Sequence, residues 1–407
     1  MRIGLDVTVL YVALGGVYRY DLNLIRAMIG AAPQHQFTLV DYAPLHGRRN
    51  LLPPLYALEG SNAQVLRCGG LRHRKLSRWR PFQRAPWCTI ARTIDGVLAP
   101  PWRAAATAVM RQQLTRHLSD VEVFHSSDVL QWRHPTARNV VTVYDLTALL
   151  LPEYHTSETL ELQAAKLRFA QEGADAVVAI SEATRRDLVA HLRIPPERVH
   201  VVCGGVDAAF RPIAERERLT RVLATVGLEC QTYILHVGTL EPRKNLIRLV
   251  EAYGLLRGEI PPPCPRLVLA GTGGWECEAL FRRIAALDLE DSVIWLGPVA
   301  DELLPSLYNG ALLFVYPSLY EGFGLPVLEA MACGVPVVAS NAGALPEVVG
   351  DAGLLINPLD THALATAMGS VLADETWRAT LAARGTARAR EFSWRRAADT
   401  MLKVYEW

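Results

Sequence analysis

Two glutamates, Glu321 and Glu329, lie eight positions apart in the segment SLYEGFGLPVLEAMACGVPVVAS. Two glycines and a proline separate them, with no serine, cysteine or histidine as an attacking group. Carboxylates accept hydrogen bonds from sugar diols, at roughly 1.5–3 kcal/mol for each charge-assisted bond. The pair therefore indicates recognition of a sugar. The alternative is that both are exposed acids at the start of a helix, where the dipole favours them.

The residues around the pair predict how it is positioned. The apolar run 311–318 predicts a strand, Pro326 suits the first turn of a helix, and Gly334 is placed to end that helix. A helix start that follows glycines binds anions through its unpaired N–H groups. A phosphate held there would leave Glu329 near an adjacent sugar and Glu321 near the group on the phosphate's other side.

Two cations, Arg243 and Lys244, form a second candidate site in the segment HVGTLEPRKNL. The preceding predicted strand ends at Gly238, so both cations follow the carboxyl end of a strand, where open α/β sheets bind ligands. Two positive charges there would neutralise a diphosphate. The alternative is a solvated surface pair.

Strands and helices alternate twice along the chain, which predicts two parallel sheets covered on both faces. We expect an α/β protein with two Rossmann-like, doubly wound domains facing each other across a cleft. The predicted domains are residues 1–208 and 209–392, with a helix over 393–407 packing back on the first. The predicted strands are 1–10, 35–42, 121–127, 139–153, 176–181, 199–207, 232–240, 265–274, 292–299, 312–318, 335–340 and 353–360. The main predicted helices are 157–175, 182–192, 245–259, 275–288, 301–311, 326–333 and 361–374.

The composition is that of a globular protein: 407 residues, 50% hydrophobic and 20% charged, with a formal net charge of +1. That charge argues against a nucleic-acid partner. Seven scattered cysteines with no C-x-x-C pair favour a reduced, intracellular protein. The N-terminus does not resemble a signal peptide, and no apolar run is long enough to span a bilayer. We therefore expect a cytoplasmic protein, with any membrane contact peripheral and on the inner face.

The stretch from Ser61 to Ile94 contains no acidic residue and mixes basic side chains with Trp79 and Trp87. Such a stretch favours contact with anionic lipid or with a lipid-linked diphosphate. The equal alternative is that the basic side chains are simply solvated and that Trp79 and Trp87 belong to the hydrophobic core.

Taken together, these motifs resemble the retaining glycosyltransferases of the GT-B fold known as family 4. The segments that carry the resemblance are the RKN loop, LAGTGG, LGPV and the E-x7-E block. In the first half they are GGVYRY, NVVTVYDLTALLLPEYHT, VVAISEATRRDL and VVCGGVD. The resemblance covers nearly the whole chain except roughly residues 45–118. It implies that the domain predicted over 1–208 binds the acceptor and the domain predicted over 209–392 binds a nucleotide-sugar donor.

The resemblance implies a role for each matching residue. Arg243 and Lys244 would hold the donor diphosphate, Glu329 the nucleotide ribose, and Glu321 the transferred sugar near the reacting centre. Further donor contacts would come from Gly15, Gly16, Gly238, Gly322, Phe323, Gly324, Leu325, Gly297, Pro298 and Val299. The last three would read the base edge through backbone groups.

The chain departs from the family at Tyr144, where family members commonly carry a histidine that helps the reacting centre. Tyrosine donates a hydrogen bond but is a poorer acid–base group near neutral pH. We place Tyr144 with Glu321, Arg243 and Lys244 as the candidate catalytic residues, and keep His125 and His155 as other candidates for a polar contact. No D-x-D motif lies in a suitable loop, so we expect no metal and no cofactor.

The function that the resemblance implies is transfer of a hexose, with retention, from a nucleoside-diphosphate sugar to a saccharide or lipid-linked acceptor, as in cell-surface polysaccharide or glycolipid synthesis. Mannose, from GDP-mannose, is favoured. The family mechanism is front-face attack, and Glu321 as a nucleophile is the lesser alternative. Rival functions are a nucleotide-sugar epimerase of the same fold and a non-catalytic sugar-nucleotide binder. A dinucleotide oxidoreductase is disfavoured, because no G-x-G-x-x-G follows a strand.

Overall fold

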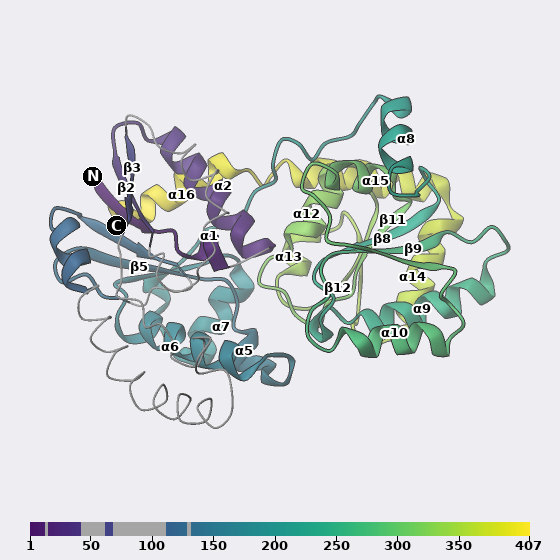
Figure 1. Cartoon of the computed structure of the whole chain (residues 1–407), viewed down its shortest axis with the longest axis horizontal. Helices are drawn as coiled ribbons and strands as arrows, with labels where there is room; N and C mark the ends of the chain where they lie inside the picture. The colour runs from purple at the N-terminus through teal and green to yellow at the C-terminus, as the bar shows by residue number, and fades with distance from the viewer. Residues whose placement is uncertain (13–14, 42–61, 68–110, 128–131) are drawn as a thin grey trace, which may run out of the picture. The chain divides into compact units, whose positions relative to one another are not determined.

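The computed structural model describes residues 1–12, 15–41, 62–67, 111–127 and 132–407. Most of the basic stretch 61–94 lies outside these residues. Strands and helices alternate along the described chain, as the sequence predicts (Figure 1). The strands form two sheets, and every recorded pairing between neighbouring strands is parallel.

The first sheet has seven strands in the order β3-β2-β1-β4-β5-β6-β7. Its central strands are runs of buried apolar residues, as expected where helices cover both faces of a sheet. The strands are β1 (Arg2–Asp6), β2 (Gln36–Asp41), β3 (Ala63–Arg67), β4 (Val123–Ser126), β5 (Arg138–Val143), β6 (Ala176–Ala179) and β7 (Val199–Val201).

The second sheet has six strands in the order β10-β9-β8-β11-β12-β13. This is the doubly wound order, in which the chain reverses direction across the sheet between β8 and β11, and ligands bind beyond the strand ends at that point. The strands are β8 (Tyr233–Val237), β9 (Arg266–Ala270), β10 (Val293–Gly297), β11 (Leu313–Tyr316), β12 (Val337–Ser340) and β13 (Leu354–Ile356).

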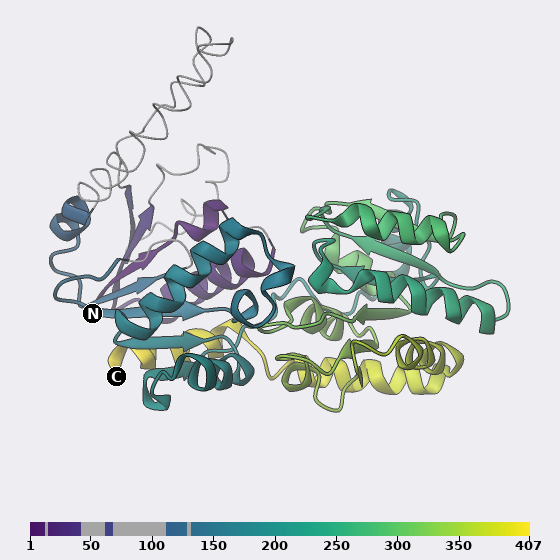
Figure 2. The same cartoon turned by 90° about the horizontal axis from the view of Figure 1, so that it is seen from below.

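Helices pack on both faces of the second sheet, with α9 and α10 on one side and α12 and α15 on the other (Figure 1, Figure 2). The helices of the first half are α1 (Val9–Val12), α2 (Gly16–Ala31), α5 (Thr147–Leu150), α6 (Ser157–Glu172) and α7 (Glu182–Leu192). Those of the second half are α8 (Arg216–Ala224), α9 (Leu246–Glu259), α10 (Cys277–Ala286), α11 (Leu304–Gly310), α12 (Leu325–Ala332), α13 (Leu345–Val349), α14 (Thr361–Ala373), α15 (Glu375–Ala389) and α16 (Trp394–Glu406). Short 3₁₀ turns cover Pro152–Tyr154, Pro196–Arg198 and Pro242–Lys244.

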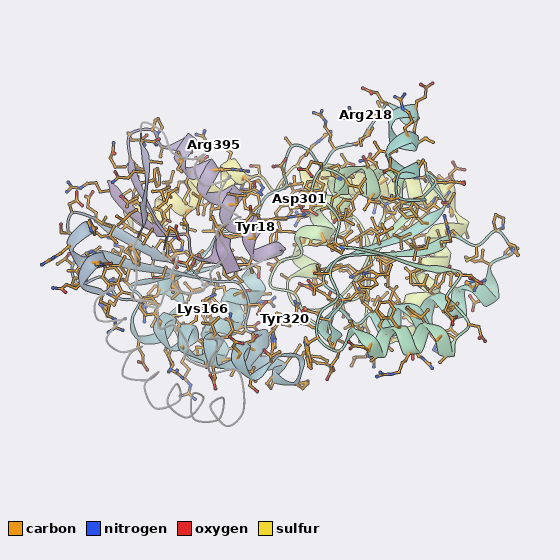
Figure 3. All side chains as sticks on the ribbon, in the orientation of Figure 1. Tyr18, Lys166, Arg218, Asp301, Tyr320 and Arg395 are labelled. Carbon is orange, nitrogen blue, oxygen red and sulfur yellow. The ribbon has the colours of Figure 1, made fainter. Side chains whose placement is uncertain are left out.

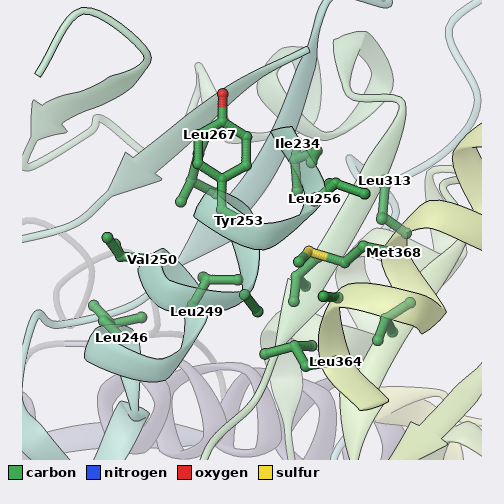
Figure 4. Packing of buried hydrophobic residues seen from close by; sticks show 14 of the residues in the cluster. Ile234, Leu246, Leu249, Val250, Tyr253, Leu256, Leu267, Leu313, Leu364 and Met368 are labelled. Atoms are coloured by element: carbon green, nitrogen blue, oxygen red, sulfur yellow. The ribbon is translucent and has the colours of Figure 1, made fainter. Parts of the chain in front are cut away.

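The main core of the second sheet packs α9, α10 and α14 against its strands (Figure 4). The core contains Leu249 and Leu256 of α9, Met368 of α14, and Ile234 and Leu313 of the central strands. Burying a side chain of this size is worth about 1.5–3 kcal/mol. The core therefore fixes β8 and β11, whose following loops carry the candidate cations and Glu321.

The packing of the chain divides it into two compact units. The smaller contains Met1–Ala13, Ile29–Thr142 and Arg168–Val177, and the larger contains Leu14–Met28, Val143–Leu167 and Val178–Trp407. The predicted domain limits 1–208, 209–392 and 393–407 stay predictions. Among the helices that the structure describes, none combines the length and apolar character needed to cross a lipid bilayer.

Several predicted element limits were wrong. The strand predicted over 1–10 ends at Asp6, because the Asp6 carboxylate accepts the N–H of Thr8 at 3.0 Å and turns the chain into α1. The strand predicted over 139–153 ends at Val143, before α5. The sequence analysis missed β3, which lies at the sheet edge, and the helices α1, α5, α8 and α13. Of these, α1 and α5 overlap stretches that were predicted as strands.

Candidate functional site

A cavity of about 550 Å³ lies within the larger unit, at the carboxyl ends of β8, β9 and β11. Of the residues predicted for catalysis and donor binding, all except Gly297 line it. Those residues are Gly15, Gly16, Tyr144, Gly238, Arg243, Lys244, Pro298, Val299, Glu321, Gly322, Phe323, Gly324, Leu325 and Glu329. Gly297 lies one step away: its carbonyl accepts the N–H of Gly271, which lines the cavity, at 2.8 Å.

The loops after β8 and β11 are tied together by hydrogen bonds. The N–H of Leu319 donates to the carbonyl of Arg243 at 2.9 Å, and the Arg243 guanidinium donates to the carbonyl of Tyr320 at 2.8 Å. Asn245 follows in a left-handed conformation and donates to the carbonyls of Pro317 and Pro358 at 3.0 and 2.7 Å. These bonds hold the two loops that carry Glu321 and the cations in one arrangement.

Glu321 is buried and forms ion pairs with both cations. Its Oε1 atom lies 2.6 Å from Nζ of Lys244 and 3.2 Å from Nη1 of Arg243. Burial alone would raise the pKa of Glu321, but Lys244 and Arg243 outweigh it and lower the pKa to about 2. Lys244 also donates to the hydroxyl of Tyr316 at 2.9 Å. Glu321 is therefore ionised throughout the physiological pH range.

Helix α12 begins at the cavity without a side-chain cap. Gly324 precedes it with φ of +113°, a conformation that L side chains rarely adopt. Gly322 allows a close approach, since a Cβ atom there would lie 1.9 Å from the carbonyl oxygen of Tyr144. Pro326 has no N–H, and the N–H of Val327 donates to the carbonyl of Gly324 at 3.0 Å. The start of α12 therefore offers a bound anion the N–H of Leu325, which lines the cavity, and the helix dipole.

Glu329 lies on α12 and is also buried, with both carboxylate oxygens occupied. Arg19 of α2 donates to Oε1 at 2.9 Å, and the hydroxyl of Tyr308 donates to Oε2 at 2.9 Å. Burial raises the pKa of Glu329 above its ordinary value, although Arg19 and Tyr308 oppose that rise. The two glutamates are thus held by different partners and differ in how readily they ionise.

Tyr144 lines the cavity, and its hydroxyl donates to Oδ2 of Asp21 at 2.6 Å. His125 lies in the smaller unit, pairs with Thr142 at 2.8 Å and does not line the cavity. His155 is also absent from the cavity lining. Neither histidine therefore takes the place that Tyr144 occupies.

Arg19, Tyr308 and Asp301 are site residues that sequence reasoning missed. Arg19 pairs with both Glu329 and Asp301, which also lies near Tyr18 of α2 (Figure 3). Arg19 and Glu329 are 310 positions apart, so no local pattern links them. The sequence indication for Arg19 was that a cation follows the predicted Gly15–Gly16 turn by about one helical turn.

A metal site has no support among the residues that the structure describes. No three histidine, cysteine, aspartate or glutamate side chains in those residues gather into a set that would hold an ion. The positive charge next to the cavity comes instead from Arg19, Arg243 and Lys244, and from the start of α12.

Two family models match the chain. Glycosyltransferase Family 4 matches residues 14–210, and Glycosyl transferases group 1 matches residues 227–390. Among curated proteins, the chain is 39% identical over 273 residues to O-antigen chain mannosyltransferase B of Escherichia coli, covering 67% of this chain and 71% of that one.

Solved structures share the fold at low sequence identity. Sucrose-phosphate synthase of Thermosynechococcus elongatus superposes with a TM-score of 0.74 at 22% identity, covering 100% of this chain and 98% of that one. Anabaena HepE in complex with UDP-glucose gives a TM-score of 0.68 at 19% identity, covering 100% and 98%. The two parallel-sheet α/β domains are thus those of the GT-B fold. This chain belongs to the family 4, group 1 glycosyltransferases and is a glycosyltransferase.

Proposed function

We propose that this glycosyltransferase transfers a hexose, with retention and without a metal ion, from a nucleoside-diphosphate sugar to a saccharide or lipid-linked acceptor. One observation carries the proposal: a single cavity brings together the Glu321–Lys244–Arg243 cluster, the uncapped start of α12 and Glu329. These groups match the sugar, the diphosphate and the ribose of such a donor.

The leaving group is a nucleoside diphosphate, which gains negative charge as the glycosidic bond breaks. Arg243, Lys244 and the start of α12, with the N–H of Leu325, are fixed in place before the reaction, so they stabilise that charge without reorganising. A divalent ion serves the same purpose in other transferases. Here the chain's own cations and helix start supply it.

Glu321 is a poor candidate for the nucleophile of a double displacement. Two cations engage the same carboxylate oxygen, and Lys244 and Arg243 lower the pKa to about 2, against the effect of burial. A carboxylate held in this way is stabilised as an anion, so its attack on carbon is disfavoured. Front-face attack fits better, with a donor phosphate oxygen taking the proton of the acceptor hydroxyl and Glu321 orienting the transferred sugar.

Mannose is the proposed sugar, and a cell-surface polysaccharide is the proposed product. The support is the 39% identity with a protein named O-antigen chain mannosyltransferase B. GDP-mannose is therefore the donor to test first, with mannose oligosaccharides as acceptors.

The test incubates the purified protein with EDTA, a mannose oligosaccharide and, in turn, GDP-, UDP-, ADP- and dTDP-sugars. Proton NMR then reports whether a glycosidic bond forms and whether its anomeric configuration matches the donor. An α-linked product from an α-donor supports the proposal. An inverted product or a requirement for metal contradicts it, and sugar interconversion without acceptor would establish an epimerase instead.

Peripheral membrane contact through residues 61–94 stays a proposal from the sequence. Flotation with liposomes, with and without anionic lipid, tests it. Binding at low salt that depends on anionic lipid supports the membrane contact. If the protein does not bind anionic liposomes at low salt, the membrane contact is excluded.

A further inference from the structure

Tyr308 lies on α11 and is completely buried. Its hydroxyl donates to Oε2 of Glu329 at 2.9 Å, while Arg19 donates to Oε1 at 2.9 Å. The carboxylate of Glu329 is therefore held at both oxygens. Tyr308 lies outside the motifs that define the candidate site, and Arg19 lies in the segment GGVYRY but was given no role there.

We propose that Tyr308 is a positioning residue for donor recognition, which holds Glu329 as an oriented carboxylate so that it accepts the two ribose hydroxyls of a nucleoside diphosphate. Arg19 is the second holder of the same carboxylate. The inference rests on the proposed function, because it takes Glu329 as the ribose-binding group.

The geometry leaves room for a diol. An ionised carboxylate has about four acceptor positions, and Tyr308 and Arg19 occupy one on each oxygen. One position on each oxygen remains, and Glu329 lines the cavity. Two adjacent hydroxyls of one sugar ring match two acceptor oxygens of one carboxylate.

Arg19 is better suited to holding Glu329 than to binding a phosphate. Its two terminal nitrogens donate separately, one to Glu329 and the other to Asp301. Phosphate recognition by arginine commonly uses both nitrogens at once. Arg243 and Lys244, which line the same cavity and pair with Glu321, are the cations we assign to the diphosphate.

The charge on Glu329 depends on its surroundings. Arg19 faces it from α2, Tyr308 from α11, Asp301 from the preceding loop and Cys333 from the end of α12. Burial raises the pKa of Glu329, and Arg19 and Tyr308 counter the rise. Removing the Tyr308 hydroxyl raises that pKa further, so in such a variant Glu329 gains its proton at a higher pH. Ribose binding is then lost earlier as the pH falls.

The test compares Tyr308→Phe with Tyr233→Phe as a matched control. Tyr233 is equally buried, and its hydroxyl donates to the carbonyl of Leu307 at 2.6 Å, beside Tyr308 but away from Glu329. Calorimetry measures binding of GDP, UDP and inorganic pyrophosphate by each full-length protein at about pH 6 and about pH 8.5. Pyrophosphate lacks the ribose and so reports on the phosphate contacts alone.

For the nucleotide that the wild type binds, Tyr308→Phe should weaken affinity about 10-fold at about pH 6, from the loss of a charge-assisted bond, and clearly less at about pH 8.5. Pyrophosphate affinity should stay within about twofold, and Tyr233→Phe should match the wild type with every ligand. The 2′,3′-dideoxy form of the nucleotide should bind wild type and Tyr308→Phe alike.

The proposal fails if Tyr308→Phe and wild type share one pH profile, or if pyrophosphate binding falls as much as nucleotide binding. Should Tyr308→Phe not fold, Arg19→Gln replaces it, with exposed Arg26→Gln of the same helix as its control. Arg19→Gln should give the same ribose-dependent, pH-dependent loss, and Arg19→Lys should recover part of it. Failure of the proposed function has a different outcome, since the wild type would then bind none of GDP, UDP, ADP and dTDP.

Discussion

The Nζ atom of Lys244 lies 2.6 Å from Oε1 of Glu321, inside the cavity that both residues line. Arg243 approaches the same oxygen to 3.2 Å. The two cations proposed to hold a diphosphate are thus already paired with a carboxylate. A donor phosphate must share them with Glu321 or displace it.

Replacing Glu321 by glutamine should therefore separate binding from turnover. If Glu321 contacts the transferred sugar as proposed, that sugar loses its charged partner, so we expect transfer to fall roughly 100-fold or more. Nucleoside-diphosphate affinity should stay equal or become tighter, because Lys244 and Arg243 lose their competing anion. Steady-state kinetics and calorimetry on the same preparation measure the two quantities.

A suitable control is Glu251→Gln on α9, which removes a partly exposed carboxylate that pairs with Arg283 of α10 at 2.8 Å. It should leave both transfer and affinity unchanged, since exposed pairs contribute about 0–1 kcal/mol. Normal turnover by Glu321→Gln would show that Glu321 does not contact the transferred sugar.

Local sequence patterns predicted the strands and helices that carry the site. They did not predict the contacts between residues far apart in the sequence. The apolar run before Glu321, the glycine turn and Pro326 mark β11 and the start of α12, because each acts on the backbone nearby. The partners of Glu329 come from α2 and α11. Only packing of the whole unit brings Arg19 and Tyr308 to it, and no spacing in the sequence records that.

The hydrogen-bond partner of Tyr144 could not be predicted from the sequence either. The sequence marks the position as a departure from the family, which leads us to expect an altered polar contact with the donor. The structure places that hydroxyl on Asp21, a residue that no motif singled out. The direction in which a side chain hydrogen-bonds is decided by its neighbours in space.

Replacing Lys244 by methionine should weaken diphosphate binding and turnover together. A charge-assisted hydrogen bond is worth roughly 1.5–3 kcal/mol, so we expect affinity for inorganic pyrophosphate to fall about 10- to 100-fold. Arginine should not restore it, because Lys244 is buried against Tyr316, where the guanidinium fork does not fit. Recovery of binding in Lys244→Arg would show that only the charge matters.

The ionisation of Glu321 predicts how its contribution to stability depends on pH. Burial opposes ionisation, yet Lys244 and Arg243 lower the pKa to about 2, from an ordinary value of 4.5. A lowered pKa contributes stability that is present above about pH 4.5 and is lost as the pH falls toward about 2. Urea unfolding of wild type and Glu321→Gln should therefore show a difference in unfolding free energy that is constant from about pH 5 to 7 and shrinks below. A constant difference down to about pH 3 would contradict the pairing.

Two glycine substitutions separate a folding requirement from a ligand requirement. A Cβ atom on Gly322 would lie 1.9 Å from the carbonyl oxygen of Tyr144, so Gly322→Ala must displace the loop that carries Glu321. We expect a loss of about 1–3 kcal/mol in the free energy of unfolding, together with loss of transfer. A Cβ atom on Gly16 meets nothing within 4 Å, so Gly16→Ala should unfold like the wild type. If Gly16 lets the backbone approach the donor diphosphate, that same variant should bind pyrophosphate more weakly. Unchanged pyrophosphate binding would remove Gly16 from the donor site, and a large loss of stability would show that its role is structural.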